Sequence, residues 1–272
     1  MTLWLLTTFP APLLAVMMLS AFMALGVAGL VIVRRFIHIE DREGLHEVAG
    51  FIYATIGVAY AVLMAFVVLV VWEQLSAAEA NVQEEAGIVR ALHEDARAYP
   101  APVAQQLRLE LQAYTSSVIH DEWPAMASGQ SSPRTDAALR AIEDTLLAFK
   151  PTNIQEQVIF GESFTQINRV IIDRTLRLHQ SQAAVPDTLW LALIIGAIVT
   201  ISFSYFFRVG SLVAQGLMTA ALAIVIASVL FVIVEFDRPF TGDIRVEPTT
   251  FEQLLVSMQG EGIPASTSPA HS

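Results

Sequence analysis

Residues 48–87 of the chain read VAGFIYATIGVAYAVLMAFVVLVVWEQLSAAEANVQEEAG. The first part, residues 48–72, contains no charged side chain. A helix of about 20 apolar residues crosses the hydrocarbon core of a bilayer, so this part predicts a membrane span. After Trp72 the sequence becomes acidic, and no proline follows before Pro100. The stretch therefore predicts one helix that leaves the bilayer and continues into a polar region.

Three further segments are also long enough to span a bilayer and contain no charged residue. They are residues 12–33, 188–207 and 212–234. The chain is 54% hydrophobic and only 15% charged, with a mean hydropathy of +0.56, which is typical of a membrane protein. Residues 12–33 do not resemble a signal peptide, because Arg34 and Arg35 follow the apolar run instead of preceding it. Short connections join the spans in pairs, which predicts two helical hairpins.

The expected fold is therefore an all-α integral membrane protein with four transmembrane helices, in two hairpins that flank a helical polar insert. The expected segments are a first hairpin at 1–72, the insert at 73–186, a second hairpin at 187–234, an interfacial tail at 235–260 and a disordered C-terminus at 261–272. Prolines divide the insert into four expected helices at 72–99, 102–123, 135–149 and 153–183. Two of them carry apolar stripes at helical spacing, which are Leu107, Leu111, Tyr114 and Val118, and Phe164, Ile167, Ile171 and Leu178.

Composition excludes several classes of function. A net charge of −11 argues against a nucleic-acid partner, which requires a basic face. The chain has no cysteine, so a thiolate metal site or a cysteine nucleophile is ruled out. We find no catalytic motif. The first hairpin loop holds five residues that could bind a metal, but their spacing matches no defined zinc or calcium site; they are His38, Glu40, Asp41, His46 and Glu47. We expect no enzyme activity, no cofactor and no metal.

Ionisable groups are absent from the interior of all four spans. Ion-coupled carriers and proton pumps place such groups at mid-membrane, whereas a passive pore can select ions with charges at its mouth. Glu73 and Glu84 lie eleven residues apart and thus on nearly the same helical face. In an oligomer they would form acidic rings that attract cations, and the alternative is a solvated helix surface.

Small residues recur at steps of three and four in the second and fourth spans. Such seams let helix backbones approach closely in lipid. They either pack within the chain, contact a neighbouring subunit or line a narrow pore. The seam residues are Gly50, Ala54, Gly57 and Ala61, followed by Gly216, Ala220 and Ala223.

Three stretches together resemble the bestrophin-like family of bacterial four-span membrane proteins. They are the stretch at 48–87, AYTSSVIHDEWPAMASG at 113–129 and EFDRPFTGDIRVEPTTF at 235–251. The resemblance implies a distant similarity to bestrophins, which are pentameric anion channels with two membrane hairpins around a helical cytosolic region. It also implies a pore lined by the second span, with Phe66 as a candidate constriction. The ion is left open, because the acidic residues favour cations.

The leading hypothesis is a multi-pass protein of the bacterial inner membrane, a homo-oligomer in the lipid bilayer and a candidate channel for small ions. The alternative is a non-conducting scaffold or sensor whose insert binds a protein partner. Arg34, Arg35 and Arg42 favour a cytoplasmic first loop, whereas bestrophin architecture implies a cytoplasmic insert, so both orientations stay open. In the tail, Glu235, Asp237 and Arg238 are expected to dock the last helix near Glu73, with Arg238 as the counter-ion.

Overall fold

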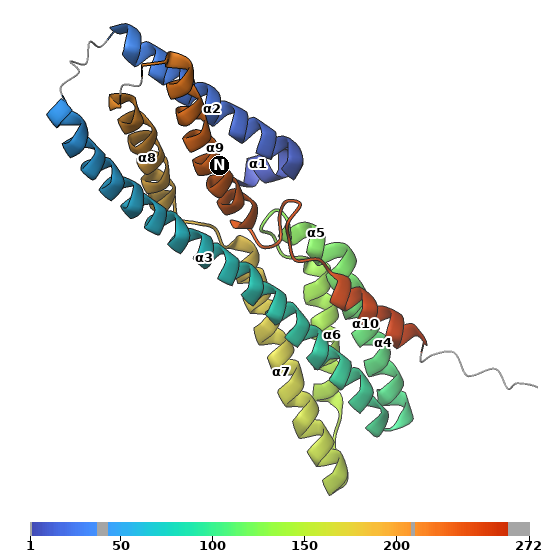
Figure 1. Ribbon diagram of the computed structural model, residues 1–272. Helices are drawn as coiled ribbons and strands as arrows, with labels where there is room; N and C mark the ends of the chain where they lie inside the picture. The colour runs from blue at the N-terminus through green and yellow to red at the C-terminus, as the bar shows by residue number, and fades with distance from the viewer. Residues whose placement is uncertain (1, 37–42, 208–209, 261–272) are drawn as a thin grey trace, which may run out of the picture. The chain divides into compact units, whose positions relative to one another are not determined.

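The computed structural model describes residues 2–36, 43–207 and 210–260, and these residues form helices and connecting loops without a β-strand (Figure 1). The first hairpin loop with His38, Glu40, Asp41 and Arg42, and the C-terminus expected to be disordered, lie outside these ranges. The chain divides into two compact units. The membrane unit comprises Met1–Leu75, Ala183–Arg238 and Gly242–Ile244; the polar unit comprises Ser76–Gln182, Pro239–Thr241 and Arg245–Ser272.

The membrane unit contains the four expected spans, so the predicted fold class is confirmed. Its helices are α1 (Thr2–Thr8), α2 (Ala11–Phe36), the first part of α3 (Glu43–Asp95), α8 (Asp187–Phe203) with a 3-10 turn at Ser204–Phe206, and α9 (Leu212–Phe236). Helices α2 and α9 pack along one another (Figure 1). The short helix α1 was not expected from the sequence.

One face of α3 packs into the core of the membrane unit. Tyr60, Met64 and Val67 are buried in a cluster that includes Leu193 and Ala197 of α8. The Tyr60 ring lies against the backbone of α8, and its hydroxyl donates a hydrogen bond to the Leu193 carbonyl over 2.9 Å. A buried hydroxyl is costly in an apolar environment unless it is hydrogen-bonded, and this bond satisfies it.

The polar unit contains the rest of α3 and the helices of the insert. They are a 3-10 turn at Ala96–Ala98, α4 (Ala101–Ser117), a π-helical turn at Val118–Glu122, α5 (Trp123–Met126), α6 (Pro133–Ala148), α7 (Ile154–Gln182) and α10 (Thr249–Gly260). Helix α4 packs between α6 and α10. The stripe predicted for α4 is buried in full, which confirms its orientation.

Two details of the insert differ from the sequence prediction. The helix expected to stop at Pro124 continues through the π-helical turn to Met126, because Pro124 occupies the first turn of α5, where a backbone N–H has no intrahelical partner. The buried line of α7 is also displaced from the predicted stripe. It shares only Ile167 with that stripe and consists of Ser163, Ile167, Val170, Arg174, Arg177 and Ser181.

The tail is divided between the two units and ends in a helix that the sequence did not predict. In the membrane unit, Gly242 adopts a φ of 92° and lies against Leu6, while the Asp243 carboxylate accepts a hydrogen bond from the first amide of α2 at Ala11 over 2.7 Å. A carboxylate is favourable at a helix N-terminus. In the polar unit, Phe251 of α10 is fully buried beside Trp123.

Candidate functional site

The face of α3 that points away from the membrane-unit core carries the expected pore and vestibule residues. Phe66 is 64% exposed, and Glu73 is exposed as well. Glu84, in the polar part of the same helix, is also exposed. Steps of seven and eleven residues bring side chains back to nearly the same face of a helix, so the three residues follow one line along α3.

The small-residue seam of α3 has open space beside its two glycines. A Cβ atom built on Gly50 or Gly57 meets nothing within 4 Å. Ala54 and Ala61 are exposed on the same side. The seam lies roughly a quarter turn from the packed Tyr60 face, because each helical residue rotates by about 100°. Its role in subunit contact stays a prediction.

The seam of α9 behaves differently. Ala223 is fully buried, and its methyl group lies 3.4 Å from the position of a Cβ built on Gly26 of α2. Gly216 has open space around it, and Ala220 is half-buried. The inner part of this seam therefore packs within the chain, as small residues do where two helices approach closely.

At the tail joint, Asp237 makes the observed contact. Its carboxylate accepts a hydrogen bond from the Val185 amide over 2.6 Å, and both Asp237 and Glu235 are buried. Among the described residues, Arg238 forms no ion pair with Glu73, and its Nε atom is buried without a hydrogen-bond partner. Docking of the last helix thus stays a prediction, with Asp237 in place of Arg238 as its anchor.

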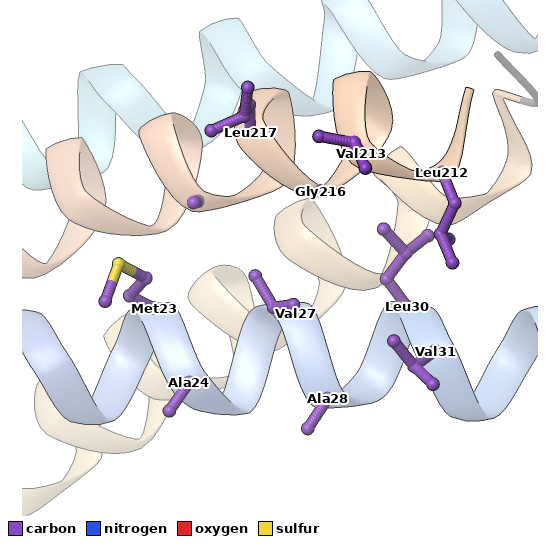
Figure 2. Close-up of a pocket in the computed structure, with 11 residues that line it drawn as sticks. Met23, Ala24, Val27, Ala28, Leu30, Val31, Leu212, Val213, Gly216 and Leu217 are labelled. Carbon is purple, nitrogen blue, oxygen red and sulfur yellow. The ribbon is translucent and has the colours of Figure 1, made fainter.

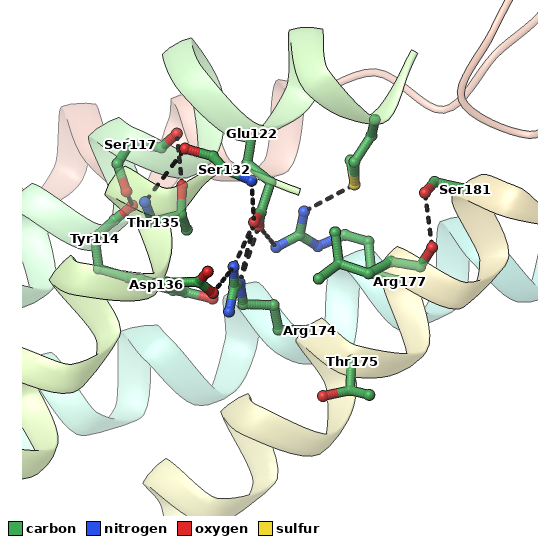
Figure 3. A network of polar contacts seen from close by, with 12 residues as sticks. Tyr114, Ser117, Glu122, Ser132, Thr135, Asp136, Arg174, Thr175, Arg177 and Ser181 are labelled. Atoms are coloured by element: carbon green, nitrogen blue, oxygen red, sulfur yellow. Dashed lines mark hydrogen bonds and ion pairs between the residues drawn. The ribbon is translucent and has the colours of Figure 1, made fainter. Parts of the chain in front are cut away.

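The polar unit contains a buried ion-pair network that the sequence did not predict (Figure 3). Arg177 is fully buried and binds Glu85 of α3 through Nε over 2.7 Å and through Nη2 over 3.0 Å. The same Nη2 atom also donates to the Glu122 carboxylate over 2.9 Å, and Nη1 donates to the sulfur of Met126 over 3.2 Å (Figure 3). The guanidinium also lies 5.4 Å from the ring centre of Trp123, within the range of cation–π attraction.

Arg174 extends this network toward the surface of the unit. Its guanidinium donates hydrogen bonds to both carboxylate oxygens of Glu122 and forms a 2.7 Å ion pair with the partly exposed Asp136. Glu122, at the end of the π-helical turn, therefore holds two arginines that are three residues apart on α7. Paired charges of this geometry tolerate burial, whereas an isolated buried ion is very costly.

Tyr114 completes the hydrogen bonding of the network. Its hydroxyl donates to Glu85 over 2.7 Å. Burial and the neighbouring carboxylate of Glu85 raise the pKa of Tyr114 well above its ordinary value, so the hydroxyl keeps its proton. Burial alone would lower the pKa of Arg177, but the Glu85 and Glu122 carboxylates outweigh it and raise that pKa. Arg177 therefore keeps its proton in the ion pairs with Glu85 and Glu122.

The network joins segments that are far apart in the sequence. α3 contributes Glu85, α4 contributes Tyr114, the π-helical turn contributes Glu122, and α7 contributes both arginines. Sequence reasoning gave none of these charged residues a buried role, because charged residues are rarely fully buried. One sequence feature could have indicated that the two arginines are buried. Arg174 and Arg177 lie on the same helical line as Ile167 and Val170.

Comparison with known proteins places the chain in a family. The model of the Bestrophin-like domain matches residues 20–251, and the chain belongs to this family. No curated protein matches the chain.

Solved structures share its fold. A variant of a bacterial Bestrophin homolog from Klebsiella pneumoniae is 15% identical, with a TM-score of 0.69, and the match covers 89% of this chain and 99% of that one. Another structure of a bacterial Bestrophin homolog from Klebsiella pneumoniae is 14% identical, with a TM-score of 0.67, and the match covers 90% and 98% of the two chains. This chain is therefore a multi-pass membrane protein of the Bestrophin-like family with a bestrophin-like fold.

Proposed function

We propose that the chain forms a homo-oligomer in the bacterial inner membrane and that its α3 helices surround a path for small ions. Family membership supports a channel, because bestrophins conduct ions. The observation that carries the proposal is the exposed line of α3 that holds Phe66, Glu73 and Glu84. A helix face that only contacts lipid has no need of carboxylates, whereas the mouth of a cation-conducting pore uses them to attract cations.

In the proposed oligomer, symmetry repeats the exposed line of α3 around a central path. In a cyclic oligomer, one α3 from each subunit repeats Phe66 as an apolar ring and repeats Glu73 and Glu84 as acidic rings. An apolar constriction can gate a pore by dewetting, and rings of carboxylates concentrate cations at a vestibule. The proposed path therefore favours cations over anions. The chain itself supplies these groups, and no cofactor or catalytic step is involved.

The proposal is tested by ion flux in liposomes that contain oligomers of verified size. Wild-type protein should conduct, and Glu73→Gln combined with Glu84→Gln should reduce the preference for cations, because the acidic rings lose their charge. Glu79→Gln is the matched control, since this exposed residue lies on another face of α3 and should leave selectivity unchanged. Unchanged selectivity in the double variant would remove both glutamates from the mouth.

A non-conducting scaffold is the second candidate. Helix α7 exposes Ile154, Val158 and Ile172, which are 80%, 66% and 63% accessible. Exposed apolar side chains grouped on one element often mark a surface that binds a protein. The absence of flux for any small ion from a verified oligomer would favour this function over the channel.

A further inference from the structure

An open apolar groove lies between α2 and α9 of the membrane unit (Figure 2). Its volume is about 650 Å³, which falls within the roughly 300–1,000 Å³ of small-molecule sites. Figure 2 shows Val27 and Leu30 of α2 facing Gly216 and Leu212 of α9. The lining residues are Met23, Ala24, Val27, Ala28, Leu30, Val31, Leu212, Val213, Gly216, Leu217 and Ala220, and all of them are apolar.

Small residues create the groove, and larger ones form its rim. A Cβ on Gly216 would meet no atom within 4 Å, so the floor is open at this point. The neighbouring side chains Val213 and Leu217 are 73% and 68% exposed. From Met23 to Val31 the groove follows α2 for about 12 Å, at 1.5 Å per residue. Its occupant is therefore long, narrow and apolar.

One end of the groove is polar and positively charged. Arg34 in the last turn of α2 donates a hydrogen bond to the side chain of Gln215, which bridges the two helices. Arg35 is exposed and follows Val31 by four residues, so it continues the groove face by one helical turn. Basic residues at the end of a membrane span attract anionic lipid headgroups.

We propose that this groove binds an acyl chain of an anionic phospholipid, with the phosphate of the headgroup at Arg35. The groove is formed by two helices that are long and apolar enough to span a membrane, so lipid tails are its natural neighbours. The interiors of the four spans offer no acidic group with which a second copy of this chain could pair Arg35. A phospholipid supplies both the apolar chain and the negative charge.

Native mass spectrometry of the full chain in mild detergent tests the site. Purified protein is titrated with phosphatidylglycerol or with phosphatidylcholine of the same acyl chains. Wild-type protein should retain phosphatidylglycerol in preference to phosphatidylcholine. Arg35→Gln should reduce retention of phosphatidylglycerol about fivefold and leave phosphatidylcholine unchanged, because one basic residue near a lipid headgroup contributes about that factor.

The groove itself is tested by filling it. Gly216→Leu should abolish retention of both lipids, and Ala28→Leu should do so from the α2 side if the first variant does not fold. Ala221→Leu is the matched control, because this exposed residue of α9 lies outside the lining. Equal retention of the two lipids by wild-type protein would overturn the proposal. Equal lipid retention by Gly216→Leu and Ala221→Leu would also overturn it. A Gly216→Leu variant that changes its subunit number but still retains lipid would do the same.

Discussion

At the scale of the residue, the least expected feature is the pair of arginines on α7. Arg177 is the largest fully buried side chain of the described residues, and its charge is matched by Glu85 and Glu122. Periodicity predicted a buried stripe on α7, but the buried line shares only Ile167 with that stripe. Periodicity could not predict that two arginines lie on the buried face. Their carboxylate partners come from α3 and from a π-helical turn, and no local sequence pattern predicts that turn.

Glu122→Gln should destabilise the polar unit by about 3–5 kcal/mol, because it leaves a positive charge in excess among buried groups. The free energy of unfolding is measured by urea titration in detergent micelles, followed by far-UV circular dichroism. Asp121→Asn is the matched control. Its ion pair with Arg134 is largely exposed, so the loss should stay below about 1 kcal/mol. Equal effects of the two substitutions would show that the network contributes no more than a surface pair.

At the scale of the element, the long helices were predictable and the turns between them were not. Uninterrupted apolar runs fix the four spans, and Pro100 ends the α3 rod close to the expected position. Pro124 misled the prediction because a proline is harmful inside a helix but acceptable in its first turn. The orientation of α3 depends on which face meets α8, and this is a tertiary contact that single-helix patterns do not contain.

Gly196→Ala should disrupt the packing of α8 on α3. The new methyl carbon would lie 2.3 Å from the Tyr60 ring, which is far closer than a normal contact. Overpacking of this kind costs about 1–3 kcal/mol. Thermal unfolding in detergent should reveal the loss as a lower Tm. Gly161→Ala on α7 is the control, since its Cβ meets nothing within 4 Å and alanine favours the helix by up to about 1 kcal/mol. A Tm for Gly196→Ala as high as that of the control would contradict this packing.

At the scale of the whole molecule, the sequence predicts the family and the order of the spans, but a single chain does not define a pore. The motifs at 48–87, 113–129 and 235–251 all lie within the matched residues 20–251, which explains why the resemblance was detectable. The seam with Gly50 and Gly57 and the line with Phe66 occupy different faces of α3. In the proposed oligomer, the seam contacts another subunit and the Phe66 line faces the water of the pore, and the sequence of a single chain describes neither.

In the proposed channel, the Phe66 face of α3 lines the conduction path. The sequence contains no cysteine, so a single introduced thiol can test this lining directly. Phe66→Cys is reconstituted in liposomes, and ion flux is measured before and after a charged, water-soluble thiol reagent is added. Modification of Phe66→Cys should block flux, whereas Ile195→Cys, on an exposed face of α8, should conduct as before. Flux that persists after complete modification of Phe66→Cys would contradict the proposed lining.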